Sequence, residues 1–138
     1  MLVKSRAVSW SFVQDFVRTN YQQLLKKTTE EVVSSIIIPE TLNRKCEYAS
    51  LLPSRNVSAS PTYYVIHLHS ALFLETFESI KKVLCSEDPA TTFLWIDIFA
   101  INQHNSFQID LEETDTAIQS ATVGSLLCCD RSGYWFVE

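Results

Sequence analysis

Hydrophobic residues recur at intervals of three and four in the N-terminal part of the chain, and this spacing predicts amphipathic helices. The first helix is expected over residues 9–27. A second is expected to begin at Thr28, because Thr28 followed by Glu31 resembles a capping box, and to stop at Pro39. The alternative is that the Ile36–Ile38 end of this second segment is extended rather than helical.

The next part of the chain, residues 41–62, is polar and rich in serine and proline, which is typical of a connection. Within it, Tyr48, Leu51 and Leu52 are expected to form one packed helical turn. Beyond this connection, segments in which hydrophobic residues recur with the period of a strand, two residues, alternate with segments that have the helical period of 3.6 residues. We expect strands over residues 63–67, 93–101 and 123–129, with helices over residues 73–84 and 111–121 between them.

Strands that alternate with helices predict an α/β fold with right-handed crossovers and a parallel sheet. Parallel sheets of this kind bind ligands beyond the carboxyl ends of their strands. The segments expected at these ends are residues 67–70, 101–105 and 130–133. Any functional site is therefore expected among these three segments.

Composition narrows the class of protein. With 138 residues, 46% hydrophobic content and 12% aromatic content, the chain suits one globular domain with a substantial core. The net charge is -5, and the eleven basic residues are scattered, so the sequence lacks the basic stripe that a nucleic-acid surface needs. The two glycines are too few for a glycine-rich phosphate loop. We expect no nucleic-acid partner.

Localisation is predicted from the hydrophobic runs and the cysteines. No apolar run approaches the roughly 18 residues that would span a bilayer, and the N-terminus lacks a continuous signal-peptide core. The four cysteines have neither the density of a disulfide scaffold nor a C-x-x-C metal spacing. We expect a cytoplasmic protein with reduced thiols and no membrane partner.

Two histidines and one aspartate are the first candidates for chemistry. His67 and His69 lie on one face of an extended segment and could form a metal-ligand pair, but zinc needs at least a third protein ligand. No third ligand is evident, since nothing places His104 nearby, and no metal is predicted. Asp97 lies in an apolar run, so we expect backbone amides of a neighbouring loop to bind it and Asp97 to anchor that loop.

Three segments resemble motifs of a known family. Residues 64–77 read Y-V-I-H-L-H-S-A-L-F-L-E-T-F, and residues 95–104 read W-I-D-I-F-A-I-N-Q-H. The chain ends in W-F-V-E at residues 135–138. These segments resemble the F-V-S-H-A-W, W-F/I-D-I-F-S-V-N-Q-H and W-C-x-x-E motifs of a TIR-like family of protist and invertebrate proteins, although only His67 of the S-H-A-W motif is retained.

The resemblance implies a flavodoxin-like, TIR-like α/β fold with strand order 2-1-3-4-5, incomplete here at about three strands because of C-terminal truncation. Residues 1–60 would form an N-terminal helical segment and linker, and residues 61–138 the truncated TIR-like domain. The third strand, residues 123–129, would then be an uncovered apolar edge, which invites pairing with another chain.

The resemblance also implies function. One interpretation is a TIR-like signalling or interaction domain that self-associates or binds another TIR-like chain, and a variant of it is a degenerate copy without independent activity. The alternative is an NAD+ hydrolase that cleaves the nicotinamide-ribose bond. In that case Glu138 would be the catalytic carboxylate, His67, Asp97, Asn102 and Trp135 would bind NAD+ as substrate, and no cofactor would be needed.

Overall fold

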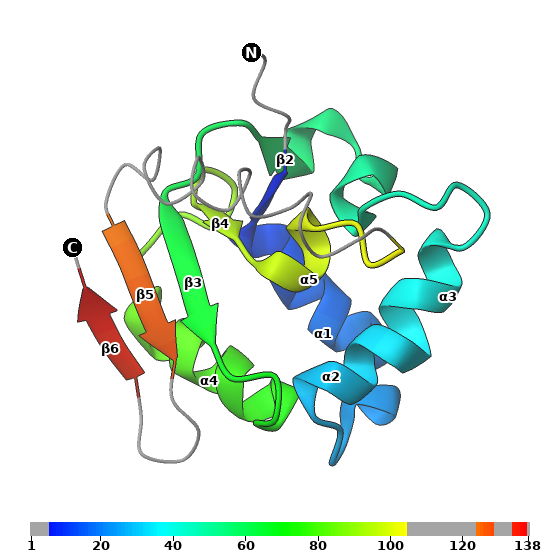
Figure 1. The fold of residues 1–138 in the computed structure, drawn as a ribbon. Helices are drawn as coiled ribbons and strands as arrows, with labels where there is room; N and C mark the ends of the chain where they lie inside the picture. The colour runs from blue at the N-terminus through cyan, green and yellow to red at the C-terminus, as the bar shows by residue number, and fades with distance from the viewer. Residues whose placement is uncertain (1–5, 105–123, 129–133, 138) are drawn as a thin grey trace.

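The computed structural model describes residues 6–104, 124–128 and 134–137, which form a mixed α/β fold around one sheet (Figure 1). The six strands lie in the order β2-β1-β4-β3-β5-β6. They are β1 (Ala7–Ser9), β2 (Val57–Ser58), β3 (Tyr63–His67), β4 (Phe93–Trp95), β5 (Gly124–Cys128) and β6 (Tyr134–Val137). The helical elements are α1 (Trp10–Leu24), α2 (Thr29–Val32), the π-helix η1 (Val33–Ile37), α3 (Ile38–Thr41), the 3-10 helices η2 (Tyr48–Leu51) and η3 (Ser54–Asn56), α4 (Phe73–Val83) and α5 (Asp97–Ala100).

The centre of the sheet is parallel, and this confirms the predicted α/β class. Strands β4, β3 and β5 run in the same direction, and α4 connects β3 to β4. Strands β1, β2 and β6 extend the sheet by antiparallel pairing, and the sequence pattern did not predict them. Strands β1 and β2 are three and two residues long, which is too short for a period to be recognised.

The prediction that the third parallel strand has an uncovered edge is wrong. Strand β5 pairs with β3 on one side and with β6 on the other. In the second pairing, Ser125 lies opposite Val137 and Cys128 lies opposite Tyr134. The chain therefore covers the edge of β5 with its own segment, and β6 is the last strand on that side of the sheet within the described residues.

The N-terminal helices follow their capping signals. The Ser9 hydroxyl accepts a hydrogen bond from the Phe12 N–H at 3.0 Å and so caps α1. At Thr28 the predicted capping box is present, since its side chain accepts from the Glu31 N–H while the Glu31 carboxylate accepts from the Thr28 N–H. Both predicted helix starts are therefore supported by side-chain hydrogen bonds.

The prediction that Pro39 stops the second helix is wrong. The helix continues from α2 through η1 into α3 and ends at Thr41. In η1 the Ile38 N–H bonds to the Val33 carbonyl, five residues back, so the α-helical ladder is already interrupted before Pro39. Pro39 then lies in the first turn of α3, where a missing N–H costs little.

The predicted strand over residues 93–101 is much shorter in the structure. Strand β4 ends at Trp95, and after Ile96 the chain turns into α5. This turn buries Phe99 completely, with its ring in edge-on contact with the rings of Phe12, Phe16 and Tyr48 at centroid distances of 5.2, 5.1 and 5.6 Å. An apolar run predicts burial, but it does not distinguish a buried strand from a buried helical turn.

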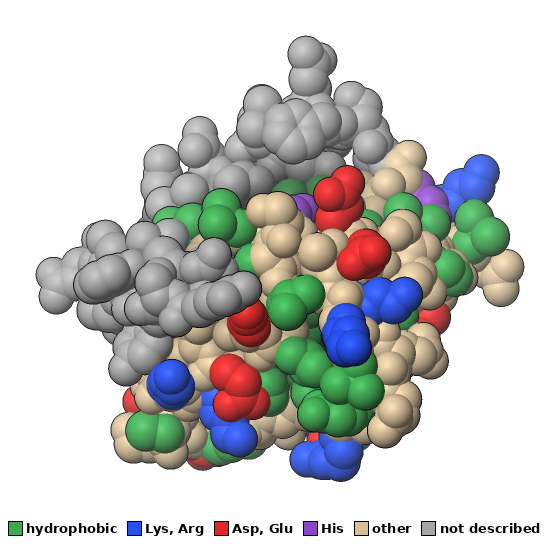
Figure 2. Space-filling model, turned by 90° about the horizontal axis from the view of Figure 1, so that it is seen from below, with side chains coloured by type: hydrophobic (Ala, Val, Ile, Leu, Met, Phe, Trp, Pro, Cys, Tyr) green, Lys and Arg blue, Asp and Glu red, His purple; other side chains and the backbone are tan. Residues whose placement is uncertain are grey.

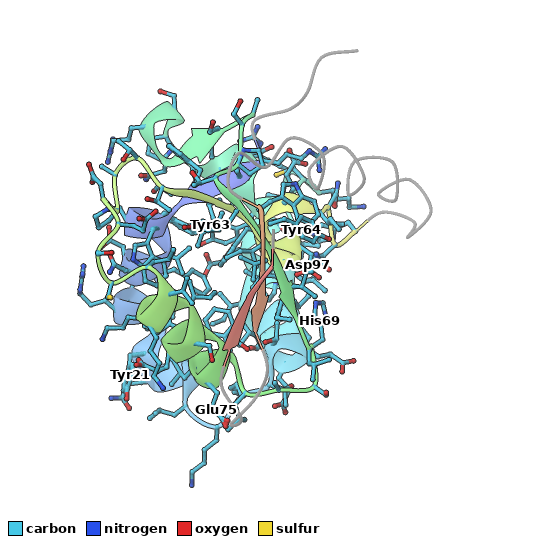
Figure 3. The ribbon with its side chains drawn as sticks, turned by 90° about the vertical axis from the view of Figure 1, so that its left-hand side faces the viewer. Tyr21, Tyr63, Tyr64, His69, Glu75 and Asp97 are labelled. Atoms are coloured by element: carbon cyan, nitrogen blue, oxygen red, sulfur yellow. The ribbon has the colours of Figure 1, made fainter. Side chains whose placement is uncertain are left out.

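The main core joins the N-terminal helices to the sheet. Helices α1 and α4 lie on the same face of the sheet (Figures 1 and 3). The buried hydrophobic residues of both helices belong to one cluster with Val65 of β3 and Leu94 of β4. Acidic and basic side chains are interspersed on the surface seen in Figure 2. Within the described residues, no helix is long and apolar enough to cross a membrane. The predicted helix over residues 111–121 lies outside the described residues.

Replacing Phe99 with alanine tests the importance of the aromatic cluster. The ring is fully buried against three other rings, so we expect Phe99→Ala to lower the free energy of unfolding by about 3–5 kcal/mol. Urea denaturation followed by tryptophan fluorescence measures this change. Leu42→Ala is the matched control, because the Leu42 side chain is 54% exposed and its truncation should cost about 0.5 kcal/mol or less. Equal losses in the two variants would contradict the central role given to Phe99.

Candidate functional site

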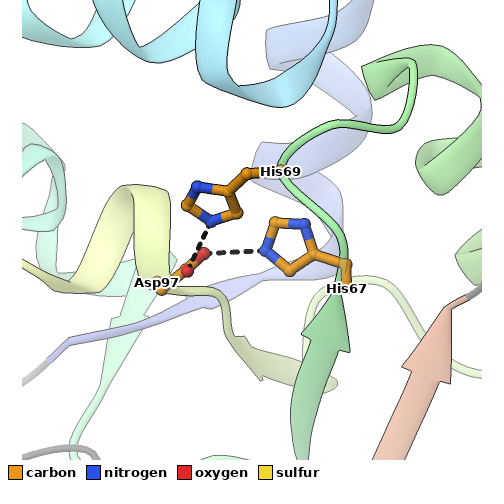
Figure 4. Close-up of side chains that lie close together, drawn as sticks. All are labelled: His67, His69 and Asp97. Atoms are coloured by element: carbon orange, nitrogen blue, oxygen red, sulfur yellow. Dashed lines mark hydrogen bonds and ion pairs between the residues drawn. The ribbon is translucent and has the colours of Figure 1, made fainter.

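Among the described residues, the strongest cluster of chemically active side chains lies at the carboxyl end of β3 (Figure 4). Nε2 of His67 donates to Oδ1 of Asp97 at 2.7 Å, and Nε2 of His69 donates to Oδ2 of the same carboxylate at 2.7 Å. The two imidazole rings have centroids 5.1 Å apart. One carboxylate is therefore shared by His67, the last residue of β3, and His69, which lies in the turn after this strand.

The register of the sheet explains why Asp97 meets His67. In the parallel pairing of β3 and β4, Tyr64 lies opposite Trp95. Two residues beyond this pair, β3 is still extended, whereas the segment that follows β4 has already turned into α5, whose first residue is Asp97. The short β4 thus places a carboxylate at the carboxyl end of its neighbour, where ligand sites of parallel sheets are formed.

The loop after β3 holds His69 in place by docking on the start of α2. The Glu30 N–H donates to the His69 carbonyl at 3.0 Å, and the Thr29 N–H donates to the Ala71 carbonyl at 3.0 Å. The Phe73 N–H at the start of α4 in turn donates to the Lys27 carbonyl at 2.9 Å. The orphan N–H groups of α2 are thereby satisfied, and the backbone of His69 is fixed relative to Asp97.

Exposure differs strongly among the three side chains. The side chain of His67 is 3% exposed, whereas those of His69 and Asp97 are 42% and 31% exposed. Figure 3 shows Asp97 and His69 on the side of the sheet away from α4. Nδ1 of His67 is buried and has no hydrogen-bond partner among the residues that the structure describes. The cluster therefore has one rigid buried member and two members that solvent reaches.

The electrostatics of the cluster favour an ionised Asp97. Burial works to raise the pKa of Asp97, but the hydrogen bonds from His67 and His69 outweigh it and hold the pKa well below its usual range. The hydrogen bond to Asp97 raises the pKa of His69, against the opposing effect of burial, and the charges of Asp97 and Glu30 act in the same direction. The carboxylate and the imidazolium of His69 therefore stabilise each other.

Asn102 and His104 lie in a separate hydrogen-bond network. Asn102 is 9% exposed, and its Nδ2 donates to the Lys45 carbonyl at 2.7 Å while its Oδ1 accepts from the His104 N–H at 2.9 Å. The His104 Nε2 lies 2.8 Å from the Thr41 hydroxyl. Through these hydrogen bonds, Asn102 anchors the loop after α5 to the segment after α3.

The remaining predicted site residues are at the end of the chain. Trp135 lies in β6 opposite Leu127, and Leu127 lies opposite Ile66 of β3. The strand β5 therefore separates the backbone of Trp135 from that of the histidine cluster. Glu138 lies outside the described residues. Of the substrate-binding residues predicted from the sequence, the structure brings His67 and Asp97 into contact.

Sequence reasoning named Asp97 as a candidate site residue but did not predict its hydrogen bonds to the histidine pair. It paired His67 with His69 but assigned Asp97 to the middle of a long strand, with backbone amides as its partners. In the structure imidazoles bind this carboxylate instead. Two imidazole nitrogens and one carboxylate form a donor set that can hold a transition-metal ion, and their ligand atoms all lie within 4.8 Å of one another.

Comparisons of the chain with protein-family models, with curated proteins and with solved structures gave no match.

The shared carboxylate makes a prediction about titration. In chelator-treated protein we expect the His69 imidazole to titrate above the ordinary histidine pKa of about 6.5, and its pKa to fall in Asp97→Asn, which removes the negative partner. Two-dimensional NMR of the imidazole protons measures both values. An unchanged His69 pKa in the variant would contradict the electrostatic coupling.

The same coupling sets the pH range in which Asp97 stabilises the fold. Because the pKa of His69 is raised in the folded protein, the contribution of His69 to the free energy of unfolding is complete below about pH 6.5. This contribution is lost as the pH rises through the pKa of His69 in the folded protein. Because the pKa of Asp97 is lowered in the folded protein, the contribution of Asp97 to the free energy of unfolding is complete above about pH 3.9. This contribution is lost as the pH falls through the pKa of Asp97 in the folded protein. We expect Asp97→Asn to destabilise the protein most between these two values, and a pH series of thermal unfolding curves checks this.

Proposed function

We propose that this chain is a TIR-like interaction domain that acts by associating with a second copy of itself or with a related domain. The observation that supports it most is the order of the parallel strands. Along the chain β3 is the first, β4 the second and β5 the third, and in the sheet they lie in the order β4-β3-β5. This 2-1-3 arrangement is the beginning of the flavodoxin-like order 2-1-3-4-5.

The proposed family and the observed fold agree at one further point. The segment that resembles the W-F/I-D-I-F-S-V-N-Q-H motif contributes β4 and α5, including the buried Phe99 and the aspartate bound by both histidines. One departure is β6, which pairs antiparallel with β5 where the flavodoxin-like order has a parallel fourth strand. The motif residues thus have structural roles in this chain that do not require catalysis.

The edge strand β6 is the surface that we propose for association. Among the described residues it is the last strand on its side of the sheet, and its sequence Tyr-Trp-Phe-Val contains neither a charged residue nor a proline. Natural edge strands usually carry such residues, because an unpaired apolar edge offers its N–H and C=O groups to another strand. Pairing of two β6 strands would continue the sheet from one copy into the next.

The position of Val137 favours association over NAD+ hydrolysis. Val137 pairs with Ser125, near the amino end of β5, whereas His67 lies level with Cys128 at the carboxyl end of the parallel strands. Val137 is therefore at the opposite end of β5 from the histidine cluster. A hydrolase would need its carboxylate and its substrate-binding residues around one ligand.

Sedimentation velocity of the full chain over a range of concentrations tests the proposed association. We expect a monomer–dimer equilibrium that Phe136→Lys weakens by about tenfold or more, because a lysine on an edge strand opposes pairing and a symmetric dimer contains the substitution twice.

Leu42→Lys is the matched control, since it adds the same charge at an exposed position next to α3, on the other side of the molecule from β6 (Figure 1). Circular dichroism confirms that each variant is folded. A wild-type protein that stays monomeric at all concentrations, or a dimer that both variants weaken equally, would contradict the proposal.

The enzymatic alternative has its own test. We expect no release of nicotinamide when the purified, folded protein is incubated with NAD+ and the products are separated by chromatography. Release that disappears in Glu138→Ala would replace the interaction proposal by NAD+ hydrolysis. Release that persists in this variant would point to a different active site or to a contaminating enzyme, which a second purification step distinguishes.

A further inference from the structure

We propose that His67, His69 and Asp97 form a binding site for one divalent transition-metal ion, with Zn²⁺ as the expected occupant. The three side chains come from the end of β3, the loop after it and the first turn of α5. Their ligand atoms lie within 4.8 Å of one another. This inference is independent of the proposed self-association, because it concerns different residues and a different ligand.

The donor atoms determine the class of metal. Mg²⁺ and Ca²⁺ prefer oxygen ligands, so a site with two imidazole nitrogens disfavours them. Zn²⁺ binds imidazole and carboxylate in tetrahedral sites, and sites with three protein ligands keep a fourth position for water or another ligand. Fe²⁺ also binds two histidines and one carboxylate. The first choice is Zn²⁺, because a tetrahedral ion needs only one ligand beyond the three that the structure supplies.

The ligand atoms lie near enough to one another for side-chain movements to bring them around one ion. In a tetrahedral zinc site with ligands at about 2.0–2.1 Å, the ligand atoms lie about 3.3 Å from one another. In the structure each imidazole nitrogen lies 2.7 Å from a different oxygen of the Asp97 carboxylate, with a hydrogen between them. Binding of one ion would replace these two hydrogen bonds and draw the ligand atoms, which now lie within 4.8 Å of one another, around a common centre.

Burial divides the site into a fixed and an accessible part. His67 is 3% exposed and is held in β3, so it provides a rigid ligand. The side chains of His69 and Asp97 are 42% and 31% exposed, so an ion from solution can reach them and water can occupy the fourth position. The backbone of His69 is fixed to α2 by the Glu30 N–H, so its side chain needs little further ordering.

The position of the proton on the His67 ring can be given both without and with a bound metal ion. In the metal-free state Nε2 carries the proton that is donated to Asp97, so the buried Nδ1 is an acceptor without a partner. When Nε2 binds a metal, the proton of the neutral ring moves to Nδ1, which becomes a donor without a partner. Metal binding therefore exchanges one unsatisfied buried group for another and adds none.

Charge also favours a cation at this position. Asp97 is ionised because of its two histidine partners, and Glu30 lies near enough to act electrostatically on His69. A divalent ion with two neutral imidazoles and one carboxylate leaves a net charge of +1, which the Glu30 carboxylate partly compensates. The protein as a whole carries a net charge of -5, which also attracts cations.

Titration of the full chain with metal tests the site. After treatment with a chelator and dialysis, Zn²⁺ is added in a calorimeter, and Co²⁺ is added in parallel because its visible absorption reports the number and type of ligands. We expect one ion per chain and a tetrahedral Co²⁺ spectrum without thiolate bands. His69→Gln and Asp97→Asn should each weaken binding by about tenfold or more, because even the loss of a residue that only supports a metal ligand costs about 10–100-fold in affinity.

His104→Gln is the matched control, because His104 lies outside the cluster, next to the Thr41 hydroxyl, and its loss should leave the affinity unchanged. Cys85→Ser removes an exposed thiol that could bind zinc adventitiously, and it should also have no effect. Circular dichroism shows whether each variant is folded, and thermal unfolding provides a second readout. Zn²⁺ should raise the melting temperature of the wild type and of His104→Gln but not that of Asp97→Asn.

The result that would overturn the inference is folded wild-type protein that binds neither ion. Binding that His69→Gln and Asp97→Asn leave unchanged would also overturn it, and would assign the metal to other residues. If Fe²⁺ or Mn²⁺ binds more tightly than Zn²⁺ and depends on the same two residues, the site stands with a different occupant. Loss of self-association in Phe136→Lys with intact metal binding would show that the two proposals are separate.

Discussion

The burial of Phe99 is the constraint on which the site depends. Its ring is enclosed by Phe12, Phe16 and Tyr48, which come from α1 and η2, so the helical turn that carries it cannot move without disturbing the core. Asp97 lies two residues earlier in the same turn. The Arg6 guanidinium donates to the carbonyl of Ala100, the last residue of this turn, at 2.6 Å. The helical turn that carries the carboxylate is therefore held in place by the packing of Phe99 and by the hydrogen bond to Ala100.

The N-terminal part of the chain takes part in the site as well as in the core. Strand β1 pairs with β4, and α1 packs with α4 in the common hydrophobic cluster. The start of α2 binds the backbone of the loop that carries His69. Removing the N-terminal helices would thus expose the core and also release one of the two imidazoles from its position. The site is a property of the whole fold rather than of the parallel strands alone.

Much of the fold could be predicted from hydrophobic periodicity, because the elements that follow it are amphipathic. Strand β3 has the predicted bounds Tyr63–His67, and α1, α4 and the turn at Tyr48 are present near their expected positions. The continuation past Pro39 could not be predicted, because it depends on a π-helical turn that leaves no mark in the pattern. The antiparallel edge strands were missed because β1 and β2 are very short, and β6 was read as a family motif.

The site itself was predicted in part, and the reason lies in the length of one strand. Both histidines could be placed on one face because a strand has a period of two, but the position of Asp97 depends on where β4 ends. The nine residues from Phe93 to Ile101 are nearly all apolar, and only tertiary packing decides that the strand stops after Trp95. A polar residue within a long apolar run is thus a signal that the run contains a turn, since burial of an unpaired carboxylate would be costly.

The two proposed surfaces lie far enough apart to act independently. Strand β5 separates β3, which carries His67, from β6, which forms the proposed edge for association. A metal ion would bind at the carboxyl end of β3 and join it to α5, without any contribution from β6. Because both partners of a β6–β6 dimer would retain an accessible histidine cluster, association would bring two such clusters into one assembly without blocking either.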